Sequence, residues 1–334
     1  MAWTVASTAG SSDPSAAGPQ LKKFFVFLMV PVVFSAFRTV DGSRRIAEAW
    51  FVVVSIAVSV AVVQFVRSVA AIAASGQDFD LTYMTDRITG FFSHWMTFSQ
   101  AGLVVLVTLL SYLLFAKRRP GFGAWWAVAV LIFVGLTLSY TRSVWLAMGV
   151  AAVYFVAVYR PRALLLAPVV LAAAYLLAPA SIQQRVLSIN TESNQARIIM
   201  WRTGLRMIEA HPILGVGPEQ VGPRFSEFQP EDVTELPPAY YGHLHNVYIH
   251  YAAERGIPAT LIVLWLFAKI IWDLTQALRS RPRLRDDRRF LLHAGISGTL
   301  AIMVVSCFDV SLGDSEVLGA YLGLVSIAYN GVDS

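Results

Sequence analysis

Residues 96–116 read MTFSQAGLVVLVTLLSYLLFA, a run without a charged side chain, and Lys117-Arg118-Arg119 follow it directly. A helix needs about 20 predominantly apolar residues to cross the hydrocarbon core of a bilayer, so this stretch is long enough to span a membrane. Further apolar runs predict an all-α, polytopic transmembrane helix bundle with about nine spans. The predicted spans are 24–37, 46–66, 96–116, 122–139, 144–159, 163–180, 257–278, 291–308 and 316–330.

The composition agrees with a membrane protein. Of the 334 residues, 56% are hydrophobic and 14% are charged, and the mean hydropathy is +0.59. An ordinary soluble domain carries about 25% charged residues, so a soluble globule of this size is excluded. Cys307 is the only cysteine, which also excludes a disulfide scaffold.

The basic residues indicate the orientation of the chain. Fourteen of the 26 Lys and Arg residues lie in four loops that fall on one side of the membrane if the spans alternate. The positive-inside rule makes that side cytoplasmic. The net charge of +5 therefore marks helix ends, and no nucleic-acid partner is expected. The residues are Arg38, Arg44, Arg45, Lys117, Arg118, Arg119, Arg160, Arg162, Arg279, Arg281, Arg283, Arg285, Arg288 and Arg289.

The spans divide the chain into four predicted segments. Residues 1–20 are rich in Ser, Ala, Gly and Pro and predict a disordered tail. Helices over 21–180 and 247–334 flank a large outer loop at 181–246. Within that loop, a short amphipathic helix is expected over about 194–210, because apolar residues recur every three or four positions. These residues are Ile198, Trp201, Leu205 and Ile208.

Arg142 is the first candidate for chemistry. It lies in the short turn between spans 122–139 and 144–159 on the outer side, where arginine is disfavoured. Two interpretations remain open: an arginine that reaches for lipid headgroups, and one that serves a function at the membrane face.

The second candidate is the sequence Gly242-His243-Leu244-His245-Asn246, where the loop re-enters the membrane. Histidine is suited to proton transfer and to donating hydrogen bonds to phosphate. Two histidines also suggest zinc, but neither a cysteine nor an obvious carboxylate cluster completes a ligand set, so no metal is expected. Asn246 can equally cap a following helix.

The third candidate group lies on the predicted amphipathic helix. Arg197 falls beside its apolar stripe, whereas Arg202 and Arg206 fall on the other flank, where a solvated basic face explains them. Arginine binds phosphate oxygens with a planar fork and keeps its charge. Arginines at the outer face therefore predict a lipid-linked phosphate or diphosphate as the ligand, and a preactivated glycan donor fits a compartment without nucleotides.

The order of several motifs resembles one family. Thr141-Arg142-Ser143 is followed by Arg197-x-x-x-Trp201, and this leads into His211-Pro212-Ile213-Leu214-Gly215-Val216-Gly217. His245-Asn246-x-Tyr248 and Glu254-Arg255-Gly256-Ile257-Pro258 come last. Over residues 85–330, this set is similar to the O-antigen ligase and polymerase superfamily of bacterial inner-membrane glycosyltransferases. The stretch Arg87-Ile88-Thr89-Gly90-Phe91 is similar to the family's early outer loop.

The resemblance implies a metal-independent enzyme without cofactors, in the bacterial inner membrane, with its active site facing the periplasm. Its partners would be membrane lipids, an undecaprenyl-diphosphate-linked glycan donor, and a lipid A-core or other glycan acceptor. Arg142 and Arg197 would hold the diphosphate, and His245 would be the catalytic histidine. His243, Arg202, Asn246 and Arg87 are implied as further substrate-binding residues, and His211 as structural.

Alternatives remain open at this point. An O-antigen polymerase would join lipid-linked repeat units, a protein could be the glycan acceptor, and a transporter or flippase would bind anionic lipid-linked substrates without reaction. The family usually has about three more spans before the large loop, so we expect an N-terminally incomplete or variant member.

Overall fold

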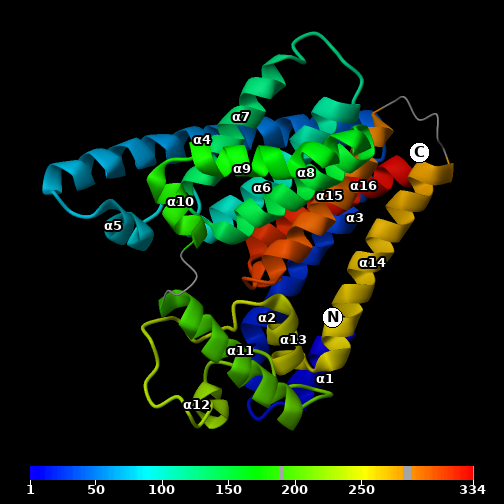
Figure 1. The fold of residues 1–334 in the computed structure, drawn as a ribbon. Coiled ribbons are helices and arrows are strands. Elements are labelled where there is room, and N and C mark those ends of the chain that lie inside the picture. Colours follow the sequence, from blue (N-terminus) through cyan, green and yellow to red (C-terminus); the bar gives the residue numbers. More distant parts are fainter. Residues whose placement is uncertain (188–191, 281–286, 334) are drawn as a thin grey trace. The chain divides into compact units, whose positions relative to one another are not determined.

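The structure is a computed structural model that describes residues 1–187, 192–280 and 287–333. Every regular element in these ranges is a helix (Figure 1). The chain forms two compact units, each assembled from distant stretches of sequence. Unit 1 comprises Met1–Met29, Ser188–Lys269 and Ser306–Leu318, and unit 2 comprises Val30–Leu187, Ile270–Val305 and Gly319–Ser334.

The helices of unit 1 are short. They are α1 (Ala2–Ala9), η1 (Pro14–Ala17), α2 (Gly18–Lys22), η2 (Lys23–Leu28), α11 (Glu192–Ala210), α12 (Phe225–Phe228), α13 (Val247–Arg255) and η4 (Ser311–Gly313). Unit 2 holds α4 (Val40–Ser75), α5 (Phe79–Thr85), α6 (Trp95–Phe115), α7 (Ala124–Leu138), α8 (Arg142–Tyr159), η3 (Pro161–Leu166), α9 (Ala167–Leu177), α10 (Ala180–Leu187) and α15 (Arg288–Ser306). The remaining helices divide between the units: α3 (Met29–Ala36), α14 (Ile257–Ser280) and α16 (Ser315–Asp333).

The prediction of an all-helical membrane protein is confirmed, but the count of nine spans is not. Among the described residues, six helices or helix runs are long and apolar enough to cross a membrane. They are Pro14–Ala36, Val40–Ser75, Trp95–Phe115, Arg142–Tyr159, Ile257–Ser280 and Arg288–Ser306. Helix α7 is apolar but has only 15 residues. The predicted span at 163–180 is interrupted, because η3 leads into an α9 of 11 residues with Pro168 in its first turn.

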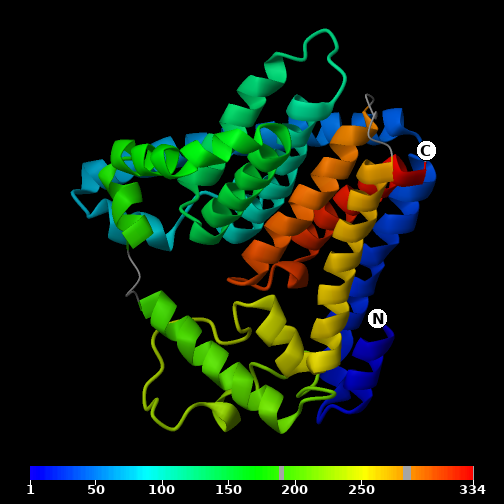
Figure 2. The same ribbon diagram turned by 45° about the vertical axis from the view of Figure 1, so that its right-hand side comes forward.

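Helix α6 forms the centre of unit 2. Most of its side chains are buried. It packs against α4, α7 and α8, whose ribbons are drawn in Figure 2. Small residues permit the close packing: Gly102 of α6 lies against Leu136 of α7, and Gly135 of α7 lies against Val58 of α4. The uncharged sequence quoted first is thus the most enclosed helix of this unit, which explains why it is apolar on all sides.

Several basic residues that predict the cytoplasmic side also hold unit 2 together. Asp287, at the start of α15, accepts a hydrogen bond from the Lys117 backbone N–H at 2.9 Å. Its carboxylate also lies 3.1 Å from Arg119 and 3.4 Å from Arg44 of α4. One buried carboxylate therefore joins α4, the loop after α6 and α15. Arg281, Arg283 and Arg285, from the predicted cytoplasmic loop after the span 257–278, lie outside the described residues.

We expect Asp287→Asn to destabilise unit 2. The side chains of Asp287 and Arg44 are only 6% and 9% exposed, and removing one partner of a buried ion pair costs about 3 kcal/mol. Asp41→Asn is the matched control, because Asp41 contacts the same arginines but its side chain is 55% exposed. Exposed pairs contribute about 1 kcal/mol or less. Thermal unfolding in detergent should show a clearly lower Tm for Asp287→Asn alone; equal shifts would contradict this assignment.

Helix α11 is present where the sequence predicts an amphipathic helix, but only Trp201 and Ile208 of the predicted stripe pack against the core. Ala196, Met200 and Met207 are buried, whereas Ile198 and Leu205 of the predicted stripe are 54% and 51% exposed. The sequence carries apolar residues on both faces, so periodicity alone does not identify the core face. Gly204, on the buried side, decides the choice because it lets α11 approach Leu244 and Ile249 closely.

The N-terminal residues, where a disordered tail was expected, contain α1 packed within unit 1. The Trp3 indole donates a hydrogen bond to the Arg255 carbonyl at 2.8 Å. The buried Ser7 hydroxyl donates to the Leu214 carbonyl at 2.6 Å. These partners lie more than 200 positions away along the chain. The composition of this segment suggests disorder, but contacts with residues that are distant in the sequence hold α1 in place.

Candidate functional site

The two histidines of the re-entry loop are held by the residue between them. Leu244 is fully buried in the core formed by α11 and α13, and its carbonyl accepts a hydrogen bond from the Trp201 indole at 3.0 Å. Gly204, one turn along the same helix, leaves room for the Leu244 side chain. The Arg197-x-x-x-Trp201 motif thus fixes the backbone between His243 and His245.

Asn246 serves as the cap of α13. Its side-chain oxygen accepts hydrogen bonds from the backbone N–H groups of Tyr248 and Ile249, both at 3.0 Å. Its amide nitrogen donates to the Cys307 carbonyl at 2.9 Å. The capping interpretation therefore accounts for Asn246. The same side chain also fixes the segment at Cys307 beside the histidine loop.

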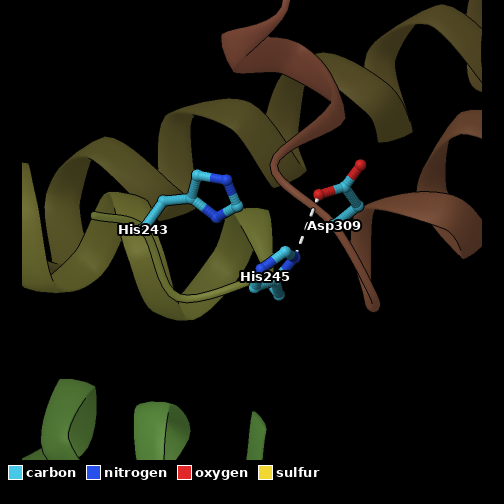
Figure 3. A group of neighbouring side chains, drawn as sticks. All are labelled: His243, His245 and Asp309. Carbon is cyan, nitrogen blue, oxygen red and sulfur yellow. Dashed lines mark ion pairs between the residues drawn. The ribbon is translucent and has the colours of Figure 1, made fainter. Parts of the chain in front are cut away.

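Asp309 follows two residues after that anchor and completes a cluster with the histidines (Figure 3). Its Oδ1 lies 3.4 Å from His245 Nδ1. The two imidazole rings lie with centroids 4.2 Å apart at an interplanar angle of 67°. One ligand atom from each of the three residues lies within 4.8 Å of the others. Both side chains of the His245–Asp309 pair are mostly buried but reachable, with exposures of 18% and 15%.

The backbone at His245 is in an unusual conformation. Its φ of 46° lies in the left-handed region, which disfavours non-glycine residues and costs of order 1 kcal/mol. Surrounding contacts sustain this conformation through Leu244 on one side and Asn246 on the other. Strained residues of this kind cluster at functional sites, and this one directs an imidazole toward Asp309.

Sequence reasoning missed Asp309. It lies 64 positions after His245, so spacing gives no indication of the pair. The available signal was its position: an acidic residue directly after the predicted span 291–308, on the same predicted side as the histidines. A turn of this kind brings a carboxylate to the membrane face, where ionisable groups usually have a purpose.

Two of the family-like motifs bind each other through the backbone. The Val216 and Gly217 N–H groups donate to the carbonyls of Ala253 and Glu254 at 2.8 and 3.0 Å. In the opposite direction, the Ile257 N–H donates to the Pro212 carbonyl at 2.9 Å. We call this contact between residues 212–217 and 253–257 the backbone clasp.

The buried charges beside the clasp are structural. Glu254 is almost fully buried, accepts a hydrogen bond from the Glu219 N–H at 2.7 Å and lies 3.0 Å from Arg255. His250, four residues earlier, lies 3.8 Å from Glu254. Burial lowers the pKa of His250 below its usual value, and Glu254 only partly opposes this effect. His250 is therefore neutral at physiological pH and belongs to the packing of α13.

We expect Gly256→Ala to disrupt unit 1. Gly256 has a φ of 82°, and a Cβ at this position would collide with the Ile213 backbone. The clasp has to open to relieve such a clash. Gly149→Ala is the control, because Gly149 lies within α8 and no atom of the described part of the chain lies within 4 Å of an added Cβ. Limited proteolysis should cut the 211–256 region faster in Gly256→Ala only; equal protection in both variants would contradict this assignment.

The arginines of α11 differ in their surroundings. Arg202 forms two hydrogen bonds with Asp232, at 2.8 and 2.6 Å, and this contact lowers the pKa of Asp232. Arg202 thus secures the loop after α12. Arg197 is half-buried and lies one turn before Trp201, on the same side of α11 as the residue that anchors the histidine loop. Of the two, Arg197 retains the stronger case as a ligand residue.

Arg87 and Arg142 belong to unit 2. Arg142 is the first residue of α8, and Tyr140, just before it, has a φ of 52°. Arg87 donates to the Tyr140 carbonyl at 3.4 Å and stacks over Trp95 at 5.1 Å. Arg87, from the loop between α5 and α6, therefore contacts the turn that leads into Arg142.

Gln64 holds the loop that carries Arg87. Its side-chain oxygen accepts hydrogen bonds from the Thr89 and Gly90 N–H groups at 3.1 and 2.9 Å. Its amide nitrogen donates to the Gly90 carbonyl at 3.0 Å. This polar side chain in the middle of the apolar helix α4 is a positioning residue that sequence reasoning did not identify.

The fold and its polar residues define a class of protein: a multi-pass, all-helical membrane protein with candidate anion-binding arginines and a histidine–aspartate cluster. Residues 127–264 match the family model described as O-antigen ligase. This match supports membership of the O-antigen ligase superfamily, the family that the order of the motifs predicted. A search among curated proteins found no match. The matched region includes Arg142, Arg197, Arg202, His243, His245 and Asn246, whereas Arg87 and Asp309 lie outside it.

Proposed function

We propose that this protein transfers a glycan from undecaprenyl diphosphate to a sugar of the lipid A core at the periplasmic face of the inner membrane. The observation that carries the proposal is the His245–Asp309 pair, whose histidine lies inside the O-antigen ligase region. Such a pair can accept a proton from a sugar hydroxyl. The arginines can stabilise a diphosphate leaving group.

The donor diphosphate is assigned to Arg142 and Arg197, with Arg87 as a further contact. Arg142 is suited to this role because it begins α8, and helix N-termini attract anions through their free N–H groups and dipole. An arginine fork adds two directed hydrogen bonds and a permanent charge. Charge on the departing diphosphate grows during the reaction, so these contacts strengthen in the transition state.

The acceptor is activated by His245. Its Nε2 accepts the proton of the acceptor hydroxyl, while Asp309 orients the ring through Nδ1–H. The acceptor oxygen then bonds to the anomeric carbon, the bond from that carbon to the phosphate oxygen breaks, and undecaprenyl diphosphate leaves with the electron pair. At 3.4 Å the Nδ1–Oδ1 contact is slightly longer than a hydrogen bond, and such contacts often tighten when substrate binds. The transfer balances without a redox cofactor or a metal ion.

Replacing the proposed base should remove activity. We expect His245→Ala to lower the rate of transfer by about 10²–10⁴-fold, the usual contribution of a general base. Asp309→Asn should cause a smaller loss, mainly in kcat, because it misorients the imidazole without removing it. The measurement uses the purified full chain in detergent with a lipid-linked glycan donor and a core acceptor. His211→Ala, in the same unit but outside the cluster, should retain activity. An unaltered rate in His245→Ala would refute the assignment.

The charge and the fork of Arg142 can be tested separately. Arg142→Ala should abolish transfer, and Arg142→Lys should recover only part of it, because lysine keeps the charge but loses the two-pronged geometry. Arg224→Ala is the control, since Arg224 pairs with Glu227 in the loop of unit 1 at 2.8 Å. Lipopolysaccharide gels of a complemented deletion strain report the outcome at matched expression. Full-length chains in the Arg142→Ala strain would contradict the role.

The same gel discriminates between ligase and polymerase. A ligase defect leaves bare core and accumulates long chains on the lipid carrier, whereas a polymerase defect leaves core with a single repeat unit. A transporter would bind the lipid-linked glycan and release it unchanged in the purified assay. The ligase proposal requires a new glycosidic bond to core sugar in that assay.

A further inference from the structure

We infer that His243, His245 and Asp309 form a zinc-binding site whose occupation inhibits the enzyme. The site rests on the geometry of these three residues, and only its inhibitory effect rests on the proposed function. In the sequence, the two histidines have no carboxylate nearby to complete a ligand set. The fold supplies that carboxylate from a distant segment, since Asp309 meets both histidines with all three ligand atoms within 4.8 Å of one another.

The distance between His245 and Asp309 fits two ligands of one ion. Zinc binds imidazole nitrogen and carboxylate oxygen at about 2.0–2.1 Å, so adjacent ligand atoms of a tetrahedron lie roughly 3.3–3.4 Å apart. The His245 Nδ1–Asp309 Oδ1 distance is 3.4 Å, whereas an N–H···O hydrogen bond typically measures about 2.7–3.2 Å. This nitrogen is buried and makes no hydrogen bond with the described residues. The two imidazole planes, inclined at 67°, converge from one side of the carboxylate (Figure 3).

The ligand set has the chemistry that zinc prefers. Two imidazoles and one carboxylate give three protein ligands and leave a fourth position for water or another group. The ligating segments are also held in place before any ion binds. Leu244 is fully buried between the two histidines, and Asn246 bonds to the Cys307 carbonyl two residues before Asp309. A preorganised site of this kind avoids the entropic cost of gathering its ligands.

Zinc binding at this position is incompatible with the proposed base. An imidazole that coordinates a metal through Nδ1 carries its single remaining hydrogen on Nε2. It therefore has no basic nitrogen for the acceptor hydroxyl. Asp309, which orients the ring in the proposed mechanism, is occupied as well. Zinc therefore replaces the proton between His245 Nδ1 and the Asp309 carboxylate. Bound zinc thus inhibits glycan transfer by competing with that proton.

Binding is tested on the purified full chain in detergent after chelator treatment. Zinc ion is titrated against a chromogenic zinc indicator, and one ion is expected per chain. His243→Gln and Asp309→Asn should each weaken binding at least tenfold, because each removes one ligand. His211→Gln and Asp314→Asn are the matched controls from the same unit and should leave the affinity unchanged. Binding of less than one ion per chain, or equal affinity in all variants, would overturn the site.

Inhibition is tested in the transfer assay. Zinc should stop transfer over the same concentration range in which it binds, and a chelator should restore the rate. In His243→Gln, inhibition relative to that variant's own zinc-free rate should require at least tenfold more zinc. Stimulation by zinc would overturn the inhibitory role and indicate a catalytic ion. Zinc binding without any transfer in the zinc-free chain would refute the proposed function and leave the site standing, whereas transfer without stoichiometric binding would refute the site alone.

Discussion

The backbone clasp between residues 212–217 and 253–257 is the constraint on which unit 1 depends. Its three hydrogen bonds tie the end of α11 to the end of α13. Trp3 and Ser7 of the N-terminal helix donate to the neighbouring carbonyls of Arg255 and Leu214. Left-handed glycines allow this approach, because any Cβ at Gly215 or Gly256 would strike the opposing backbone. With these ends fixed, α11 and α13 enclose Leu244 and hold the histidines on either side of it.

Two positions beside the candidate catalytic residues carry left-handed backbone at non-glycine residues. Tyr140 comes two residues before Arg142, and His245 is itself the proposed base. A hydrogen bond from a distant part of the chain supports each position. The Tyr140 carbonyl accepts from Arg87, and Asn246, next to His245, donates to the Cys307 carbonyl. Conformations that cost free energy are sustained by their surroundings, and here both lie where a charged or basic side chain has to be aimed.

The motif residues fall into two groups: those that hold the backbone in place, and those whose side chains keep a candidate functional role. Trp201, Gly215, Asn246, Glu254 and Gly256 are accounted for by backbone contacts and capping. Arg202 is paired with Asp232. Arg142, Arg197 and the His243–His245–Asp309 cluster keep a functional interpretation. The motifs that resemble the family thus contain structural residues as well as candidate active-site residues. The contacts of each residue distinguish the two groups.

The sequence by itself determined that this is an all-helical membrane protein, because long uncharged runs and basic loop ends depend only on local composition. It also predicted the family that the family model supports, the helix at α11, and the candidates Arg142, Arg197 and His245. Only the tertiary structure decided which face of α11 is buried, since both faces are apolar. The order of α1, the pinning of the Arg87 loop by Gln64 and the partnership of His245 with Asp309 were likewise decided there. These features join residues from 25 to more than 200 positions apart, and local patterns carry no information about which distant segments meet.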